Sequence, residues 1–348
     1  MNAVTAGFFP LDQQLGLRNS HWSEGVVKEV VRLSALMPYE QVAETLERIG
    51  QIPISASTAW RLAQERGERF RQREEMERRA ANALPSEEGR SERRRHRKGK
   101  RMGVAMDGGM IPIRGEGWKE VKVGAVFEVA RRQVVDEETR ERVEVGCAVK
   151  QSYVAHLGGP EAFGEKLWAE ASRRGWKGSW ETEVLGDGAV WIWNLAADHF
   201  YDSYQVVDWY HAREHLAYAA SLLKGEGTEE ARQWRKQRET TLYQGHALRI
   251  AQELEGEAER RPQQAEELQR EAGYFRNNAR RMNYMEMREE GWVIGSGAVE
   301  SGVKQIKERF AGPGMRWSRI GAERLLPVRT AVMSQRFDQI WSELYALP

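Results

Sequence analysis

The sequence predicts a mixed α/β domain that carries a large helical insertion and follows a mainly helical N-terminal region. Two observations lead to this prediction. Apolar runs with partial two-residue alternation, bounded by glycine, are concentrated between residues 102 and 207, as expected for strands. The segments on either side have the three-to-four-residue apolar spacing of amphipathic helices. We divide the chain into five segments. They are a helical region (1–89), a basic linker (90–101), a first core segment (102–223), a charged helical insertion (224–290) and a final core segment (291–348).

Composition excludes several classes of protein. Lys and Arg number 53 and Asp and Glu 52, so the net charge is +1 and only local clusters can attract nucleic acid. The single cysteine, Cys147, excludes an internal disulfide and a cysteine-rich zinc site, and it suits a reducing compartment. The sequence shows no signal-peptide pattern and no apolar run of about 18 residues. We therefore expect a cytoplasmic protein with no membrane partner.

The N-terminal region has the pattern of three helices between residues 24 and 80. A turn after Gly50 leads to a Ser/Thr-rich cap and a helix that carries Arg61, which is compatible with a helix-turn-helix DNA-binding element. Ser57, Thr58 and Arg61 are then its DNA-contacting candidates. An ordinary helical bundle is the alternative. From Glu65 to Leu84 the helix is charged all round, which indicates an exposed helical linker or a dimerising arm.

The basic linker at 90–101 contains eight Lys or Arg residues and one acid. Such a run is either a solvated flexible segment or a segment that follows phosphates.

The pattern then changes to strands. A short apolar run ends abruptly at Asp107-Gly108-Gly109, and two alternating segments follow, so we expect an antiparallel meander. Helices and two further strands come next, and these strands end at Asp187-Gly188 and at Asp208. The resulting order, β-β-β-α-β-α-β-α, is that of a ribonuclease H-like domain. The predicted strands are 102–106, 118–129, 143–153, 183–186 and 204–207, and the predicted helices are 160–174, 190–200 and 211–223.

The charged insertion contains one unusual segment. Between Tyr274 and Tyr284, aromatic, basic and amide residues alternate, a composition suited to contacts with DNA backbone and bases. Arg280 and Arg281 are the DNA-binding candidates of this segment.

The stretch Gly295-Ser296-Gly297 is a flexible turn with helix-capping chemistry, and it places Glu300 in the first turn of a helix. Lys304 and Lys307 follow on the same helix face. A surface ion pair between Glu300 and Lys304 is one interpretation, and a site carboxylate is the other. Further cations that we place near phosphates are Arg309 and Arg316, and Trp317 belongs either near a base or in the core.

Asp107, Asp187 and Glu300 are the candidate metal ligands. Three carboxylates brought together repel one another, and divalent cations with oxygen ligands relieve that repulsion. Two Mg²⁺ ions roughly 4 Å apart would clamp the attacking and leaving oxygens of an in-line phosphodiester displacement. A lone Asp-Gly after a strand is more often a simple turn.

Several rare sequence strings, which follow one another in the right order along the chain, resemble those of bacterial insertion-sequence DDE transposases of the ISKra type. These enzymes are related to Mutator-like transposases. The resemblance covers about residues 100–345 and rests on Met-Asp107-Gly-Gly, Gly-Asp187-Gly-Ala-Val-Trp, Val-Asp208-Trp-Tyr-His211, the segment from Tyr274 to Tyr284, Gly-Ser-Gly-Ala-Val-Glu300 and Gly-Met-Arg-Trp317.

The resemblance implies a ribonuclease H-like fold in which a helical insertion precedes the last acid. Asp107, Asp187 and Glu300 would bind two Mg²⁺ or Mn²⁺ ions, and Asp208 and His211 would assist at the DNA strands. It also implies cleavage at element ends and 3′-hydroxyl strand transfer, with terminal inverted repeats and target DNA as partners. A homo-oligomer on paired ends, association with the bacterial nucleoid and no organic cofactor are further expectations. The alternatives are a nuclease of the same fold without strand transfer, and a non-catalytic DNA-binding protein.

Overall fold

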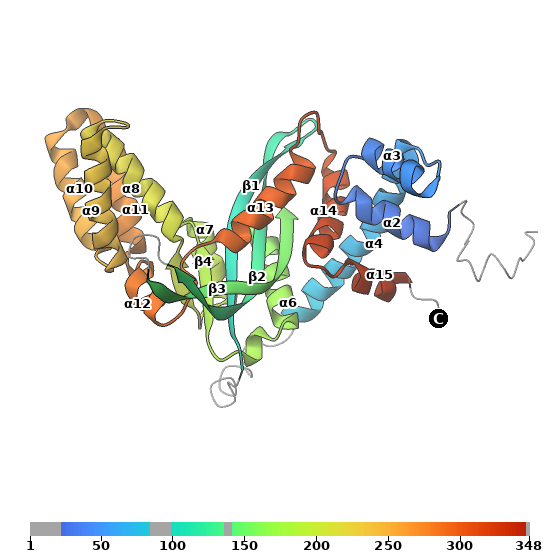
Figure 1. Cartoon of the computed structure of the whole chain (residues 1–348), viewed down its shortest axis with the longest axis horizontal. Helices are drawn as coiled ribbons and strands as arrows, with labels where there is room; N and C mark the ends of the chain where they lie inside the picture. Colours follow the sequence, from blue (N-terminus) through green and yellow to red (C-terminus); the bar gives the residue numbers. More distant parts are fainter. Residues whose placement is uncertain (1–21, 84–98, 136–140, 346–348) are drawn as a thin grey trace, which may run out of the picture. The chain divides into compact units, whose positions relative to one another are not determined.

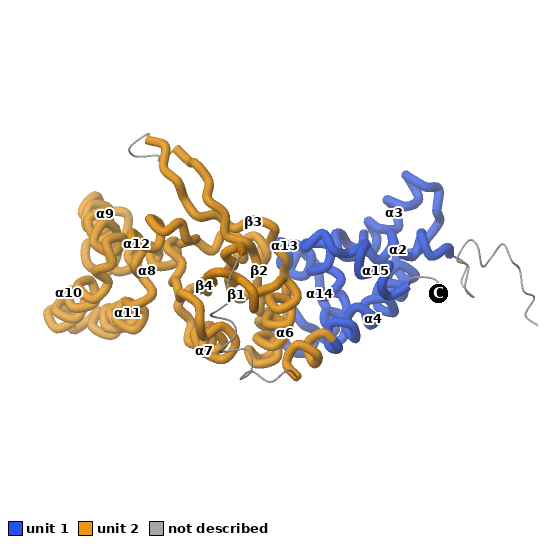
Figure 2. The backbone as a smooth tube through the Cα atoms, turned by 90° about the horizontal axis from the view of Figure 1, so that it is seen from below, with its two compact units in different colours: residues 1–76, 110–119, 305–348 blue, residues 77–109, 120–304 orange. Residues whose placement is uncertain are grey.

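The computed structural model describes residues 22–83, 99–135 and 141–345. The predicted basic linker therefore lies outside the described residues except at 99–101. The chain forms two compact units (Figure 2). Unit 1 comprises 1–76, 110–119 and 305–348, and unit 2 comprises 77–109 and 120–304. This grouping differs from our division of the sequence, which assigned all residues after 290 to the core domain.

Unit 1 contains the three predicted N-terminal helices. They are α2 (Glu24–Ser34), α3 (Tyr39–Gly50) and the first part of α4 (Ala56–Asn82). Ser23 caps α2 by accepting a hydrogen bond from the Val26 N–H, and α3 ends at Gln51 in the left-handed conformation. These helices enclose a small core formed by Val30, Val42, Leu46, Ile54 and Ala59.

The charged half of α4 is not an exposed arm within unit 1, so that prediction was wrong there. A Cβ at Gly67 would lie 2.4 Å from the main-chain oxygen of Arg324, which shows how closely α4 packs on α14 (Arg319–Met333). Phe70 stacks on Phe337 of α15 (Phe337–Tyr345), with ring centroids 5.7 Å apart. Gly67 and Phe70 are three residues apart and therefore lie on one face of α4, which is buried although the rest of this half is charged.

Unit 2 is built on a mixed five-stranded sheet in the order β3-β2-β1-β4-β5 (Figure 1). β2 and β3 are antiparallel, whereas β4 runs parallel to both β1 and β5. The mixed α/β class is therefore confirmed. The strands are β1 (Arg101–Ile113), β2 (Gly117–Val135), β3 (Arg142–Leu157), β4 (Thr182–Gly186) and β5 (Tyr204–Val207). The helices that alternate with β3, β4 and β5 are α6 (Pro160–Arg173), α7 (Val190–His199) and α8 (Trp209–Lys224).

The expected strand break at Asp107 was wrong, because β1 continues through it to Ile113. Gly108 serves the packing of two strands and does not end the strand. A Cβ at Gly108 would come within 2.5 Å of Glu120 Oε1, so this glycine makes room for a side chain of β2.

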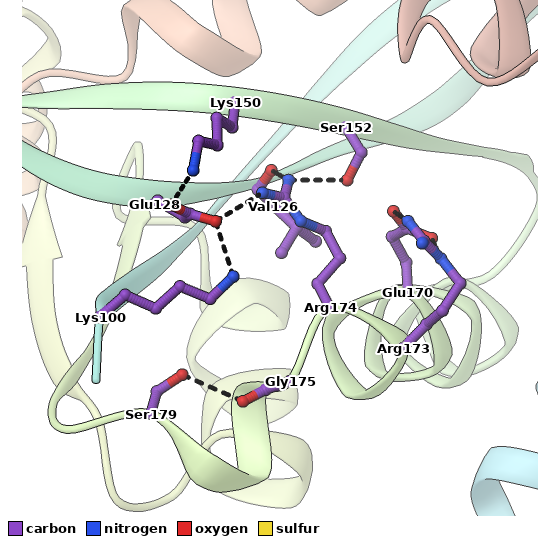
Figure 3. A network of polar contacts seen from close by, with 10 residues as sticks. All are labelled: Lys100, Val126, Glu128, Lys150, Ser152, Glu170, Arg173, Arg174, Gly175 and Ser179. Atoms are coloured by element: carbon purple, nitrogen blue, oxygen red, sulfur yellow. Dashed lines mark hydrogen bonds and ion pairs between the residues drawn. The ribbon is translucent and has the colours of Figure 1, made fainter. Parts of the chain in front are cut away.

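A β-bulge in the β2–β3 ribbon is fixed by charged side chains (Figure 3). Lys150 adopts a φ of 50° at the bulge, and its Nζ lies 3.0 Å from Glu128 Oε2. Lys100 Nζ lies 2.6 Å from the other oxygen of Glu128. Arg174, which follows α6, donates from Nη1 to the Val126 main-chain oxygen at 2.6 Å. The helix end and the bulge are thus held together.

The predicted insertion is a bundle of helices beside the sheet, packed on α8 (Figure 1). It consists of α9 (Glu229–Tyr243), α10 (Ala247–Arg260), α11 (Ala265–Asn278) and α12 (Tyr284–Glu289). Short 3₁₀ turns occupy Trp176–Gly178, Pro262–Gln264 and Ala279–Arg281. The chain then enters α13 (Gly297–Phe310). None of the helices in the described part of the chain has the length and apolar character needed to cross a membrane.

Candidate active site

Asp107 lies on β1, and Asp187 directly follows the last residue of the neighbouring parallel strand, β4. The register of β1 against β4 runs to Ala105 opposite Leu185, and each aspartate follows two residues later. β4 ends at Gly186, so Asp187 leaves the sheet where its neighbour continues. Both aspartates are half-buried. The sheet therefore brings the two acids together although 80 positions separate them in the sequence.

Each of these aspartates also shapes its own main chain. The Gly108 N–H donates to Asp107 Oδ1 at 2.6 Å, and the Ala189 N–H donates to Asp187 Oδ1 at 2.8 Å. The second bond closes the turn that leads from β4 into α7.

Asp208 joins three elements of the site. Its side chain is completely buried, and its N–H donates to the Gly186 main-chain oxygen at 2.8 Å. Its Oδ1 accepts from the His211 N–H at 2.8 Å and so caps α8. Its Oδ2 accepts from the Ser296 N–H, at the turn that opens α13. Asp208 thus fixes the end of β4, the start of α8 and the start of α13, which is a positioning role.

Glu300 lies in the first turn of α13, as predicted. The Ser296 hydroxyl donates to Glu300 Oε1 at 3.0 Å, and within the described residues Glu300 forms no ion pair with Lys304. The helix approaches the sheet closely at Gly302, where a Cβ would lie 2.8 Å from the Tyr153 ring. The Tyr153 hydroxyl oxygen lies 3.3 Å from the Ala298 main-chain oxygen and 2.6 Å from Gln151 Oε1. This packing orients the first turn of α13.

The charges of these groups act on one another. Burial raises the pKa of Asp107, and the negative charges of Asp187 and Glu300 raise it further. The Gly108 N–H and the charge of His211 lower it in part. The Asp107 carboxyl group is therefore within electrostatic range of two acids and one imidazole that come from other segments.

His211 and Glu300 also come close to Asp208. One ligand atom from each of Asp208, His211 and Glu300 lies within 4.8 Å of the others. This set differs from the predicted metal ligands, since it contains only Glu300 of the three. His211 is about one-third exposed, and its Nδ1 lies 3.3 Å from Glu214 Oε2. The imidazole therefore stands beside the acids with access to solvent.

Most predicted DNA-binding side chains are exposed. In unit 1, Thr58 Oγ1 accepts from Arg61 Nη2 at 3.0 Å at the start of α4, next to exposed Ser57. The other exposed candidates are Arg280, Lys304, Lys307 and Arg316.

Arg309 is not placed near phosphates as we expected, and Trp317 takes the core position, one of its two alternatives. Arg309 is 2% exposed, donates from Nε to the Ser34 main-chain oxygen and lies over the rings of both Tyr39 and Trp317. Trp317 is buried and donates from Nε1 to the Phe310 main-chain oxygen at 2.9 Å, so the core alternative holds for it. Both residues stabilise unit 1.

The segment from Tyr274 to Tyr284 turns inward more than its composition suggests. Arg281 lies over the Trp193 ring at 4.4 Å and donates from Nε to Gln205 Oε1 at 2.7 Å. Asn278 is buried and accepts from Trp193 Nε1 at 3.1 Å. The Tyr274 hydroxyl donates to the Asp187 main-chain oxygen at 3.0 Å. The sequence singled out this segment but gave no sign of its partners, which lie far away along the chain.

Comparison of the chain with protein-family models and with curated protein sequences gave no match.

Proposed function

We propose that this protein is a DDE transposase with a ribonuclease H-like core, which cleaves DNA at insertion-sequence ends and joins the 3′-hydroxyls to target DNA. One observation carries the proposal. Asp107 of β1, Asp187 at the end of β4 and Glu300 of α13 come from three distant segments, and the last two raise the pKa of the first. The element order from β1 to α8 also agrees with that expected from the resemblance.

The donor set suits Mg²⁺ or Mn²⁺, because carboxylate oxygens are hard ligands and the acids repel one another without a cation. Asp107, Asp187 and Glu300 would hold two such ions, which would activate water or a 3′-hydroxyl and stabilise the departing oxygen. His211 would accept or hold a proton beside Asp107. Asp208 would keep the segments that carry Asp187, His211 and Glu300 in register.

Exposed side chains would supply the DNA contacts. Ser57, Thr58 and Arg61 at the start of α4 would bind the terminal inverted repeats, while Lys304, Lys307 and Arg316 would contact phosphates. Two or more copies on paired DNA ends would complete the assembly.

A strand-joining assay tests this function. Oligonucleotides with the inverted repeats that flank the gene are incubated with a supercoiled plasmid, the full-length protein and Mg²⁺. We expect joined products from the parent and a loss of at least about a hundredfold in Asp187→Asn, because that variant lacks one ligand charge. The control Asp198→Asn changes an exposed acid on α7 and should join like the parent.

Any other outcome either contradicts the assignment of the acids or favours one of the two alternative functions. Equal joining by Asp187→Asn and the parent would contradict the assignment of the acids. Cleavage without joining would indicate the nuclease. DNA binding without either reaction, unchanged in Glu300→Gln, would indicate a non-catalytic DNA-binding protein.

A further inference from the structure

The helical insertion contacts the turn that carries Asp187. Tyr274, on α11, donates its hydroxyl hydrogen to the Asp187 main-chain oxygen at 3.0 Å. The next residue, Gly188, has a φ of 107°, and a Cβ there would lie 2.7 Å from Tyr274 Cε2. The phenol ring thus lies directly against the main chain of the turn. Position 188 requires glycine because its φ is positive and because a Cβ would clash with the ring.

A second contact holds the Tyr274 ring. The imidazole of His215, on α8, stacks on it with centroids 3.5 Å apart and an interplanar angle of 18°. His215 Nδ1 lies 2.5 Å from Glu271 Oε2, and Glu271 is only 3% exposed. Glu271 and Tyr274 are three residues apart on one helix face, so the imidazole bridges both. A buried hydrogen bond to a charged group is stronger than an exposed one.

A second link runs from the same helix to α7. Asn278 donates from Nδ2 to the Tyr274 main-chain oxygen at 3.0 Å and accepts from Trp193 Nε1 at 3.1 Å. The Asp187 turn is therefore fixed by α11 at its own main chain and through the helix that follows it.

Burial raises the pKa of Tyr274, and the negative charges of Asp187 and Asp208 raise it further. The hydroxyl group consequently keeps its proton, and so remains a donor, at neutral pH.

We propose that the helical insertion is part of the catalytic centre, with Tyr274 as a positioning residue that holds the Asp187 turn and is held in turn by the His215–Glu271 pair. This inference rests on the proposed function for the reaction that it serves. The insertion would then connect changes in its own helices, for example on binding DNA, to the geometry of the second acid.

The test uses the full-length protein and two readouts. Hydrogen exchange over residues 186–190 reports the rigidity of the turn, and titration with Mn²⁺ reports the site. Tyr274→Phe removes only the hydroxyl, and the matched control Tyr284→Phe removes a buried hydroxyl that has no hydrogen-bond partner among the described residues. Asp187→Asn serves as the reference for loss of a ligand.

We expect Tyr274→Phe to exchange faster at the turn and to bind Mn²⁺ about fivefold more weakly, the effect of one lost hydrogen bond. Tyr284→Phe should match the parent in both readouts. Unchanged exchange at 186–190 in Tyr274→Phe would overturn the inference. Where the parent binds Mn²⁺ more tightly than Asp187→Asn, faster exchange with unchanged Mn²⁺ affinity in Tyr274→Phe would overturn it too. If the turn loosens but the parent and Asp187→Asn bind Mn²⁺ equally poorly, the positioning contact stands and the proposed function fails.

Discussion

Glu183 is a completely buried carboxylic acid in the middle of β4. Its Oε2 accepts from the Val293 N–H at 3.3 Å, and its Oε1 has no hydrogen-bond partner among the described residues. Burial raises the pKa of Glu183 well above its ordinary value, and the Val293 N–H and the charge of Arg101 offset this only in part. The group is therefore expected to be protonated in the folded protein at a pH where the unfolded chain has lost the proton.

This arrangement predicts a specific dependence of stability on pH. The unfolded carboxyl group titrates near 4.5. Because the folded-state pKa is raised, unfolding releases a proton, and the free energy of unfolding falls as the pH rises from that value through the folded-state pKa. Each unit of difference between the two pKa values corresponds to about 1.4 kcal/mol. Glu183→Gln should lose this slope and become more stable than the parent at high pH.

Denaturant unfolding of the two proteins between pH 4 and pH 8 measures the difference. Glu226→Gln, at an exposed turn, is the control and should follow the parent. Parallel curves for Glu183→Gln and the parent would contradict the raised pKa.

For single residues, the sequence indicated the three candidate acids but not the side chains that hold the surrounding structure in place. Asp107, Asp187 and Glu300 stood out because each is next to glycine-rich sequence at the edge of a periodic pattern. The contacts of Tyr274 with Asp187 and of Arg309 with Ser34 could not be foreseen, since these hydrogen bonds span 87 and 275 positions. Long-range contacts of this kind leave no local periodicity.

At the scale of elements, the close packing of α13 on the sheet depends on the glycine at position 302. Gly302 faces the sheet, and a Cβ there would approach two atoms of the Tyr153 ring at 2.8 Å. Gly302→Ala should therefore destabilise the protein by about 1–3 kcal/mol, the usual result of overpacking, and should reduce DNA joining because the first turn of α13 moves with Glu300.

Gly256→Ala in α10 is the matched control. A Cβ at Gly256 meets no atom within 4 Å, so this variant should gain about 0.5–1 kcal/mol from helix propensity. Thermal unfolding and the joining assay measure both variants. A Gly302→Ala protein as stable and active as Gly256→Ala would show that the close approach is unimportant.

The order of the strands and helices was predictable, whereas some of their ends were not. The start of α13 was indicated by Ser296 and its flanking glycines, and β5 matches its predicted bounds. β1 was predicted to stop at Asp107, but pairing with β2 carries it on to Ile113. Tertiary pairing thus overrode a local Asp-Gly-Gly signal.

At the scale of the whole molecule, the sequence predicted a core interrupted by a helical insertion, but it did not predict that 305–348 group with the N-terminal helices. The reason is physical. The contacts that define unit 1 include Gln64 Nε2 with the Gly321 main-chain oxygen and Arg324 with Glu68, and each joins residues more than 250 positions apart. Apolar periodicity identifies a helix face but not the partner that covers it.

The central claim is that Asp107, Asp187 and Glu300 act as one metal-dependent unit that joins DNA. The most direct measurement compares the Mg²⁺-dependent joining rate of the parent with those of Asp107→Asn, Asp187→Asn, Glu300→Gln and the triple variant. Residues that act as a unit give non-additive losses. We predict that each single variant falls to the rate of the triple variant while still binding the repeat DNA. A single variant that retained the parental joining rate would contradict the claim.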